Sequence, residues 1–511
     1  MTVPLVSTVV LAPLLAAVAL LLVPERSRWA IRAVALVGSG ISLVGAILIA
    51  LQYDLHAGGV QFRELVELVP ALGIRYSVGV DGWGVSLVLL TGIILFAGCF
   101  ASITVKHRDR EFYLLLLLLS AGVFGVFVSL DLFVLFLCYE IAVLPMYLLI
   151  GIWGSSKKVE PGGPLGFAMR KLDVGGREYA AMKLTLMLLG GSALILVAIF
   201  GLWVAGNRSF DMEALAKLKL PRELQLWAFP ALWVGFGSLA GLWPFHTWSP
   251  DGHAAAPTAV SMLHAGVLMK LGAYGVIRVG MVLLPEGAQA WAPAVGAVAA
   301  INILWGALSA MAQKDLKYIV AYSSVSHMGV VLLGAATLTV NGWNGAIFQM
   351  TAHGVMTGML FALVGLVYER AHSRDVPSMG GFAKHMPAVA VFFTLAGLSS
   401  LGLPGTAGFV AELLVVLGAL QSGNYWWMAP AVLGAFLTAI YVLRAVRMIF
   451  WGPHPEGRFH DLTDARGPEL VALVILGACI LGFGVWPRVI LDPIDSTTVV
   501  YVQAATAKGA P

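Results

Sequence analysis

Long apolar runs, each sufficient to cross a lipid bilayer, dominate this chain. A spanning helix needs about 20 apolar residues, and the 511-residue sequence holds about fourteen such runs. Only 11% of the residues are charged, about half the share found in soluble domains. Because lipid offers no hydrogen-bond partner to the backbone, runs of this length predict helices. The expected fold class is therefore an all-α integral membrane protein with about 14 transmembrane helices.

Short polar loops separate most of the expected spans. The spans lie near residues 4–23, 33–53, 82–104, 113–129, 132–153, 183–204, 227–243, 257–283, 291–312, 318–336, 343–367, 387–420, 427–450 and 469–489. The first run lacks a basic leader and is too long for a signal peptide, so it is interpreted as an uncleaved helix. Residues 54–80 form a longer loop with strand-like pieces, and residues 154–182 form a Gly/Pro-rich basic loop. The tail after residue 489 is expected to hold no further helix.

Basic residues are unequally distributed between alternate loops. Roughly 19 Lys and Arg residues lie on one side of the membrane and roughly 8 on the other. The richer side should be cytoplasmic, which places both termini on the periplasmic side of a bacterial inner (plasma) membrane. Lys314, Asp315 and Lys317 lie at a helix end on the cytoplasmic side, and they are interpreted as a solvated anchor.

Three ionisable side chains interrupt the apolar runs: Glu140, Lys270 and Glu412. An ionisable group in hydrocarbon costs several kcal/mol unless it faces protein or water, so each is a candidate functional residue. Two acids and one base are the residue types of a proton relay. The three cysteines, Cys99, Cys138 and Cys479, show no CxxC spacing, so neither a disulfide framework nor a metal site is expected.

Two spans are interrupted by Pro and Gly, at Pro244 and at Pro404. The two prolines are five expected helices apart, and because five is odd the second unit would be inverted relative to the first. Broken helices at matched positions of inverted repeats indicate an ion path, although simple packing kinks are the alternative. The expected organisation is one polytopic domain over residues 1–511 with two inverted five-helix repeats, each containing a broken helix. Its parts are 1–112 (helices 1–3), 113–283 (first repeat, helices 4–8), 291–452 (second repeat, helices 9–13) and 469–489 (helix 14).

Five segments resemble signatures of the antiporter-like subunits of respiratory complex I, in the same order along the chain. They are CYEIAVLPMYLLIGIWG (138–154), HTWSPDGHAAAPTAVSMLHAGVLMKLGAYG (246–275), DLKYIVAYSSVSHMG (315–329), AHGVMTGMLF (352–361) and LGLPGTAGFVAE (401–412). The match is to the M-type subunit of bacterial NADH-quinone oxidoreductase, which is homologous to mitochondrial subunit 4, because Glu412 stands where L- and N-type subunits carry Lys.

The resemblance implies a proton-translocating subunit of the membrane arm, which couples quinone reduction to proton transport through a mid-membrane relay. No redox chemistry is expected in this chain itself: NADH, FMN, iron–sulfur clusters and quinone would be held by partner subunits. The expected partners are the L-type and N-type neighbours, the bilayer and protons, with no nucleic acid.

The same resemblance assigns roles to individual residues. Glu140 is the acid on the fifth helix, Lys270 the relay base, His327 and His353 polar links, and Glu412 the terminal acid. Three further candidates are open to two interpretations. Lys183 either extends its amine to the membrane surface or takes up protons. A relay role for His264 is possible in sequence, but His264 lies off the Lys270 face of its helix. His246 or His264 is an alternative partner for Glu140.

One position departs from the family pattern. Members carry a Lys five residues before the first broken helix's Pro, as the partner of the fifth-helix Glu, and here that position is Leu239. Either Glu140 pairs with another group, or this chain is a divergent copy that pumps weakly or serves as a scaffold. A subunit of a related cation/proton antiporter or a membrane-bound hydrogenase is the remaining alternative.

Overall fold

The computed structural model describes residues 4–105, 107–156, 175–453, 455, 458–459 and 462–508. Within these residues, 13 helical segments are long and apolar enough to span a membrane. Two shorter apolar helices, α16 (Pro387–Ser400) and α17 (Ala407–Gln421), together account for the remaining expected span, 387–420. The predicted all-α membrane fold is therefore confirmed.

The other elements follow in chain order. The first part of the chain forms α1 (Leu5–Leu22), α2 (Arg28–Gln52), β1 (Gln61–Val69), β2 (Ile74–Val80), α3 (Gly82–Ala101), α4 (Asp109–Val128), α5 (Leu132–Trp153), α7 (Arg177–Ala205), α8 (Met212–Lys217), α9 (Arg222–Ala240) and α10 (Trp248–Ala255). The rest forms α11 (Thr258–Leu263), the π-helical η3 (His264–Leu268), α12 (Met269–Gly275), the π-helical η4 (Val276–Met281), α13 (Pro285–Ala312), α14 (Leu316–Ala336), α15 (Val340–Ala371), α18 (Met428–Val446), the π-helical η8 (Arg447–Trp451), α19 (Pro468–Val485) and α20 (Arg488–Lys508).

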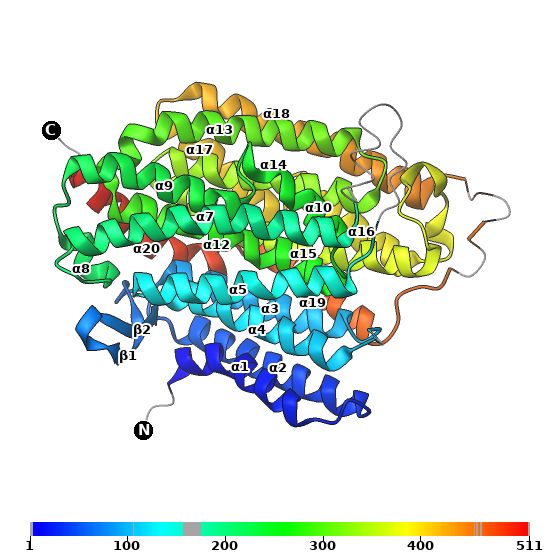
Figure 1. Cartoon of the computed structure of the whole chain (residues 1–511). Coiled ribbons are helices and arrows are strands. Elements are labelled where there is room, and N and C mark those ends of the chain that lie inside the picture. The colour runs from blue at the N-terminus through cyan, green and yellow to red at the C-terminus, as the bar shows by residue number, and fades with distance from the viewer. Residues whose placement is uncertain are drawn as a thin grey trace, which may run out of the picture.

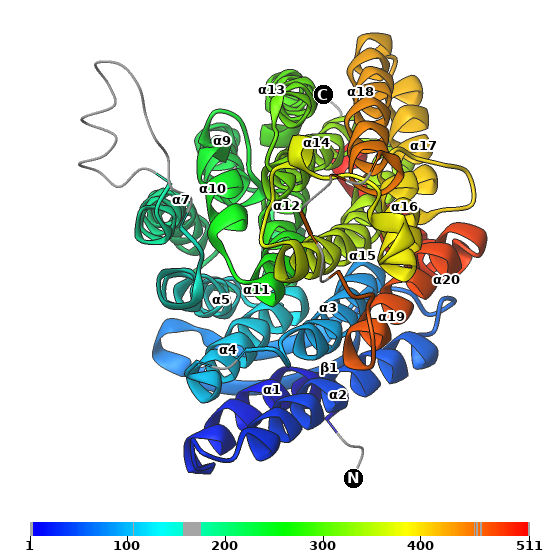
Figure 2. The ribbon, with the colours of Figure 1, turned by 90° about the vertical axis from the view of Figure 1, so that its right-hand side faces the viewer.

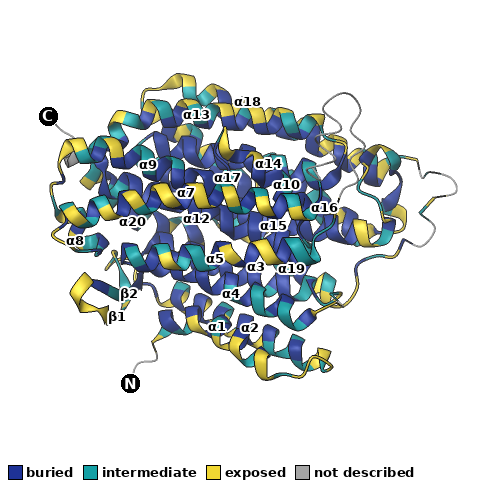
Figure 3. Ribbon diagram, in the orientation of Figure 1, coloured by how far each residue is buried: buried dark blue, intermediate teal, exposed yellow. Residues whose placement is uncertain are grey.

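The helices run side by side in Figure 1 and are seen mostly end-on in Figure 2. Their burial separates an inner set from an outer set. In the most apolar stretch of 258–281 and of α15, all residues are buried inside the chain. In the corresponding stretches of α1, α2, α7 and α19, at most 44% of the residues are buried. Figure 3 shows the same contrast, with exposed residues along the outer helices. The polar residues on the inner helices are therefore shielded from lipid by the chain itself.

Both predicted helix breaks are present. α9 ends at Ala240 and is followed by Gly241, whose φ of +80° suits glycine; the short turn η2 (Phe245–Thr247) then leads into α10. In the second half, α16 ends before Gly402 and Gly405, whose φ values of +73° and +91° carry the chain through the second break into α17. The inverted relation of two five-helix repeats stays a prediction.

Of the predictions for segments outside the spans, one is confirmed and one is wrong. The strand-like loop is confirmed as an antiparallel hairpin of β1 and β2. The expectation of no helix after residue 489 is wrong, because α20 covers Arg488–Lys508. Its sequence is too polar for a span. It instead packs against α3 and α15 at the hairpin's end of the bundle (Figure 1). Most of the basic loop 154–182, namely 157–174, lies outside the described residues.

Candidate proton relay

Lys270 lies fully buried on α12, between the two π-helical segments η3 and η4. Its Nζ donates a hydrogen bond to the carbonyl of Ala265 and lies 2.6 Å from Nδ1 of His353 on α15. On the other side of that ring, Nε2 of His353 lies 2.9 Å from the Thr357 hydroxyl. π-Helical turns are rare and occur frequently at functional sites, because they redirect side chains and free carbonyls. Here the carbonyl that Lys270 contacts belongs to the π-helical η3.

A glycine contact brings the Lys270 and His353 helices together. A Cβ added to Gly354, the residue after His353, would lie 2.6 Å from the carbonyl oxygen of Gly266 on η3. Such close backbone approach between membrane helices requires small residues on both sides. The two glycines therefore set the spacing at which the Lys270 amine reaches the His353 ring.

The polar contacts continue from His353 to Glu412 on α17. The ring centroids of His353 and His327 (on α14) are 5.2 Å apart. Nδ1 of His327 lies 3.7 Å from the Glu412 carboxylate and 3.1 Å from the Gln349 amide, while its Nε2 lies 3.1 Å from the Ser400 hydroxyl. A Cβ at Gly402, in the second helix break, would lie 2.6 Å from Glu412 Oε2, so the break makes room for this carboxylate.

Four of the predicted site residues are thus brought together: Lys270, His353, His327 and Glu412. Three are at most 2% exposed, and the Glu412 side chain is 16% exposed. An amine, two imidazoles and a carboxylate can each bind and release a proton. A chain of such groups in a shielded interior has the chemical composition of a proton path.

A further buried histidine, His253 on α10, was not selected from the sequence. It is fully buried, its ring lies 4.2 Å from that of His264, and its Nε2 is 3.4 Å from the Met269 sulfur. His264 also stacks on Trp248, with ring centroids 5.1 Å apart. Neither Nδ1 of His253 nor either ring nitrogen of His264 has a hydrogen-bond partner among the described residues. The available signal was that His253 stands in the same resembling segment as His246 and His264, which were selected.

Glu140 lies apart from this cluster. It is on α5, next to Ser192 of α7, and its Oε1 is buried without a hydrogen-bond partner in the described part of the chain. The expected alternative pairing with His264 is not formed there, since both nitrogens of that ring are also unpartnered. Leu239 is fully buried, at a point where α9 packs against the backbone of α12 at Gly272.

Lys183 and His246 lie near each other beside the first helix break. Nζ of Lys183 is 2.7 Å from the carboxylate of Asp251, which also accepts a 3.0 Å hydrogen bond from Tyr318. His246 is 5% exposed, and Lys183 is close enough to act on it electrostatically. Asp251 was missed because an acid in a Pro/Gly-rich turn is typical of surface turns.

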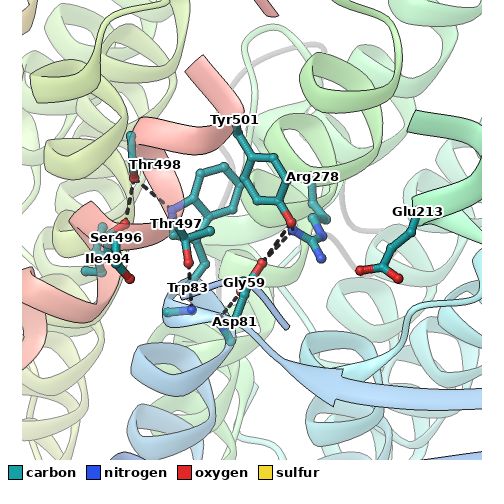
Figure 4. A network of polar contacts seen from close by, with 12 residues as sticks. Gly59, Asp81, Trp83, Glu213, Arg278, Ile494, Ser496, Thr497, Thr498 and Tyr501 are labelled. Carbon is teal, nitrogen blue, oxygen red and sulfur yellow. Dashed lines mark hydrogen bonds and ion pairs between the residues drawn. The ribbon is translucent and has the colours of Figure 1, made fainter. Parts of the chain in front are cut away.

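A second buried charge cluster, also not anticipated, lies two turns beyond Lys270 (Figure 4). Arg278 on η4 forms a 2.6 Å ion pair with Asp81, the residue that caps α3. Tyr501 of α20 bonds to both groups, at 3.2 Å from Asp81, and its ring lies under the guanidinium. Thr498 on the same helix accepts a 2.9 Å hydrogen bond from the Trp83 indole. The cluster therefore fixes α20 to the start of α3 and to η4.

The interpretation of Asp315 and Lys317 as a solvated anchor is wrong. Asp315 is 8% exposed and Lys317 is 5% exposed, and only Lys314 beside them is open to solvent. The Lys317 amine donates a 2.6 Å hydrogen bond to the carbonyl of Ala256, at the junction between α10 and α11. The positive-inside pattern gives the side of the membrane but not the direction of a side chain, which explains the error.

Comparison with known proteins places this arrangement in a family. A family described as "NADH:quinone oxidoreductase/Mrp antiporter, TM" matches residues 129–438, which include Glu140 and all four residues of the cluster from Lys270 to Glu412. NAD(P)H-quinone oxidoreductase chain 4 1 of Synechococcus sp. (strain JA-2-3B'a(2-13)) is 39% identical, with 97% of this chain and 92% of that protein covered.

Two solved structures have the same fold. A chain of respiratory complex I from Thermus thermophilus with bound NADH matches with a TM-score of 0.87 and 28% identity, covering 98% of this chain and 99% of that one. A chain of the Mrp complex from Dietzia sp. DQ12-45-1b matches with a TM-score of 0.83 and 21% identity, covering 99% of this chain and 100% of that one, a likeness of fold. This chain therefore belongs to the family of antiporter-like membrane subunits of NADH:quinone oxidoreductases and Mrp antiporters, and within it to chain 4 of the NAD(P)H-quinone oxidoreductases.

Proposed function

We propose that this chain is a proton-translocating subunit of the membrane arm of an NADH-quinone oxidoreductase. In this proposal Lys270, His353, His327 and Glu412 carry protons in succession. The observation that supports it is their close succession across α12, α15, α14 and α17: a 2.6 Å contact from Lys270 to His353, rings 5.2 Å apart between His353 and His327, and 3.7 Å from His327 to Glu412. Full-length similarity to chain 4 of the oxidoreductases supplies the enzyme context.

The relay works by transfer of one proton at a time. The Lys270 ammonium gives a proton to Nδ1 of His353, 2.6 Å away, and becomes a neutral amine. The imidazolium passes a proton to His327, which passes one to the Glu412 carboxylate. A charge in the interior attracts opposite charge and repels like charge more strongly than in water, so each transfer alters the proton affinity of its neighbours.

Redox chemistry belongs to the partners in this proposal. NADH, FMN, iron–sulfur clusters and quinone are assigned to other subunits, and L-type and N-type neighbours flank this chain in the membrane. The basic loop side faces the bacterial cytoplasm, and the β1–β2 hairpin and α20 face the periplasm.

A second candidate is a subunit of a cation/proton antiporter. Leu239, which is buried where family members carry the partner Lys for Glu140, leaves the first half without the usual Glu–Lys pair and so favours a divergent, weakly pumping or scaffold copy rather than the antiporter. The likeness to the Mrp chain concerns the fold alone and does not decide between the two. A scaffold that only spaces its neighbours is ranked below both, because buried ionisable groups are costly to keep in a membrane.

Purification of the tagged chain from its native membrane distinguishes the candidates. We expect it to co-purify with NADH-oxidising, flavin-containing subunits and, after reconstitution, to support NADH-driven proton transport. Lys270→Met should abolish that transport while the complex still assembles. Sodium- or potassium-driven proton exchange without any NADH oxidation would overturn the oxidoreductase assignment in favour of the antiporter. Assembled complex that transports protons normally with Lys270→Met would overturn the relay.

A further inference from the structure

The break between α10 and α11 leaves backbone carbonyls without helical partners in the interior of the bundle. Pro257 has no N–H, and Ala256 is extended (ψ 150°), so the last carbonyls of α10 need other donors. Arg374 donates to the Ala254 carbonyl at 2.8 Å, and the Ser155 amide donates to that of Ala255 at 2.7 Å. The Lys317 amine donates to the Ala256 carbonyl at 2.6 Å.

The two cations at this helix end have different surroundings. Arg374 is also 3.3 Å from the Asp315 carboxylate, so its charge is paired. Lys317 has no ion-paired carboxylate among the described residues, although it is only 5% exposed. Helix capping by a cation accounts for Arg374 in full. It does not by itself account for the Lys317 ammonium, which is buried and forms no ion pair among the described residues, although the Asp315 carboxylate acts on it electrostatically; such burial is costly.

The position of Lys317 joins the helix end to the histidines of the relay. His253 is on α10, three residues before the carbonyl that Lys317 caps, and Lys317, His264 and Lys270 are the charged or titratable groups that act on it. His253 Nδ1 is buried and unpartnered in the described part of the chain, as are both nitrogens of His264. On the surface side, a small pocket lined by Asp251, Tyr318 and Arg374 opens beside the same helix end.

We propose that Lys317 is the residue through which protons enter the relay from the basic side of the membrane. The Lys317 ammonium transfers a proton towards the neutral imidazole of His253, and the resulting amine regains a proton from water on the cytoplasmic side. His253, His264 and Lys270 then continue the path to Glu412. This inference rests on the proposed proton-translocating function and adds an uptake residue to it.

Three substitutions separate proton uptake from helix capping. Lys317→Arg keeps a cation and a donor for the Ala256 carbonyl, but a guanidinium does not release its proton. Lys317→His keeps an exchangeable proton, and Lys317→Met keeps neither. Arg374→Lys is the matched control, because it alters the neighbouring cap and leaves the proposed uptake residue in place. NADH oxidation and proton transport are measured together in reconstituted vesicles, per assembled complex.

We expect proton transport to fall at least about tenfold in both Lys317→Arg and Lys317→Met, and to recover in part in Lys317→His. Arg374→Lys should transport protons at the normal rate. A purely capping role predicts normal transport in every variant that assembles, so normal transport by assembled Lys317→Arg or Lys317→Met overturns the proposal. If Lys317→Arg does not assemble, the comparison of Lys317→His with Lys317→Met decides. In this experiment the proposed function is contradicted by a different result, the absence of NADH-driven proton transport in wild-type vesicles.

Discussion

Gly354→Ala tests whether helix spacing controls the relay. The added Cβ would lie 2.6 Å from the Gly266 carbonyl oxygen, whereas ordinary contact begins at 3.4 Å. The backbones must therefore separate by about 0.8 Å, because a carbonyl on a packed helix cannot rotate away. If that movement reaches the side chains, the 2.6 Å contact between Lys270 and His353 lengthens to about 3.4 Å, beyond the usual hydrogen-bond range.

A misplacement of about 1 Å costs up to about 100-fold in rate, so we expect proton transport to fall between about tenfold and 100-fold in Gly354→Ala. Because the machine is coupled, NADH oxidation should fall with it. Gly358→Ala is the matched control: it adds the same methyl one turn along α15, where it meets only the flexible end of Ile94. Normal transport by assembled Gly354→Ala, or equal losses in both variants, would refute the spacing argument.

Three further outcomes are expected. Leu239→Lys should assemble and change the proton-to-electron ratio measured in vesicles if the Glu140 half is latent, and an unchanged ratio would argue against latency. Asp81→Ala leaves the Arg278 charge buried and unpaired, so it should lower the free energy of unfolding by about 3–5 kcal/mol. Thr498→Val removes the hydrogen bond between α20 and Trp83 and should lower the free energy of unfolding by about 1–3 kcal/mol. Equal small effects of the two substitutions would contradict the ion-pair argument. The Arg63 guanidinium beside Glu213 holds the pKa of that carboxyl below its usual range of about 4.3. This pair therefore stabilises the hairpin above that range, and the stabilisation is lost as the pH falls through the lowered pKa of Glu213. Hydrogen exchange of the β1 amides, measured between pH 6 and about 3, should become faster as the pair is lost, beyond the intrinsic effect of pH. Glu213→Gln should abolish this pH dependence.

The helical spans and both helix breaks were predictable from the sequence because each depends on local composition. Apolar runs of about 20 residues and the Pro/Gly interruptions at Pro244 and Pro404 are sufficient to place them. The relay residues from Lys270 to Glu412 were selected because ionisable groups are rare in such runs. α20 was missed because its residues are polar overall and its docking depends on contacts with α3 and α15, which are distant in sequence.

The direction of side chains at the helix ends could not be predicted from the sequence either. The same basic residues that indicate the cytoplasmic side include Lys314, which is exposed, and Lys317, which is buried against Ala256. Composition does not separate the two, because the difference arises from the carbonyls freed at the α10–α11 break. The ion pair of Arg278 with Asp81 likewise depends on the fold, which brings together residues that are distant in sequence.

The central claim is that Glu412 ends a proton relay, and Glu412→Gln tests it most directly. The amide keeps the size and hydrogen-bonding capacity of the side chain, so assembly should survive, but it cannot accept the proton from His327. NADH oxidation and proton transport are measured in the same reconstituted vesicles. The relay predicts that both fall together, by at least about tenfold. Normal proton transport at normal NADH turnover in the Gln variant would contradict the relay and leave the scaffold interpretation in its place.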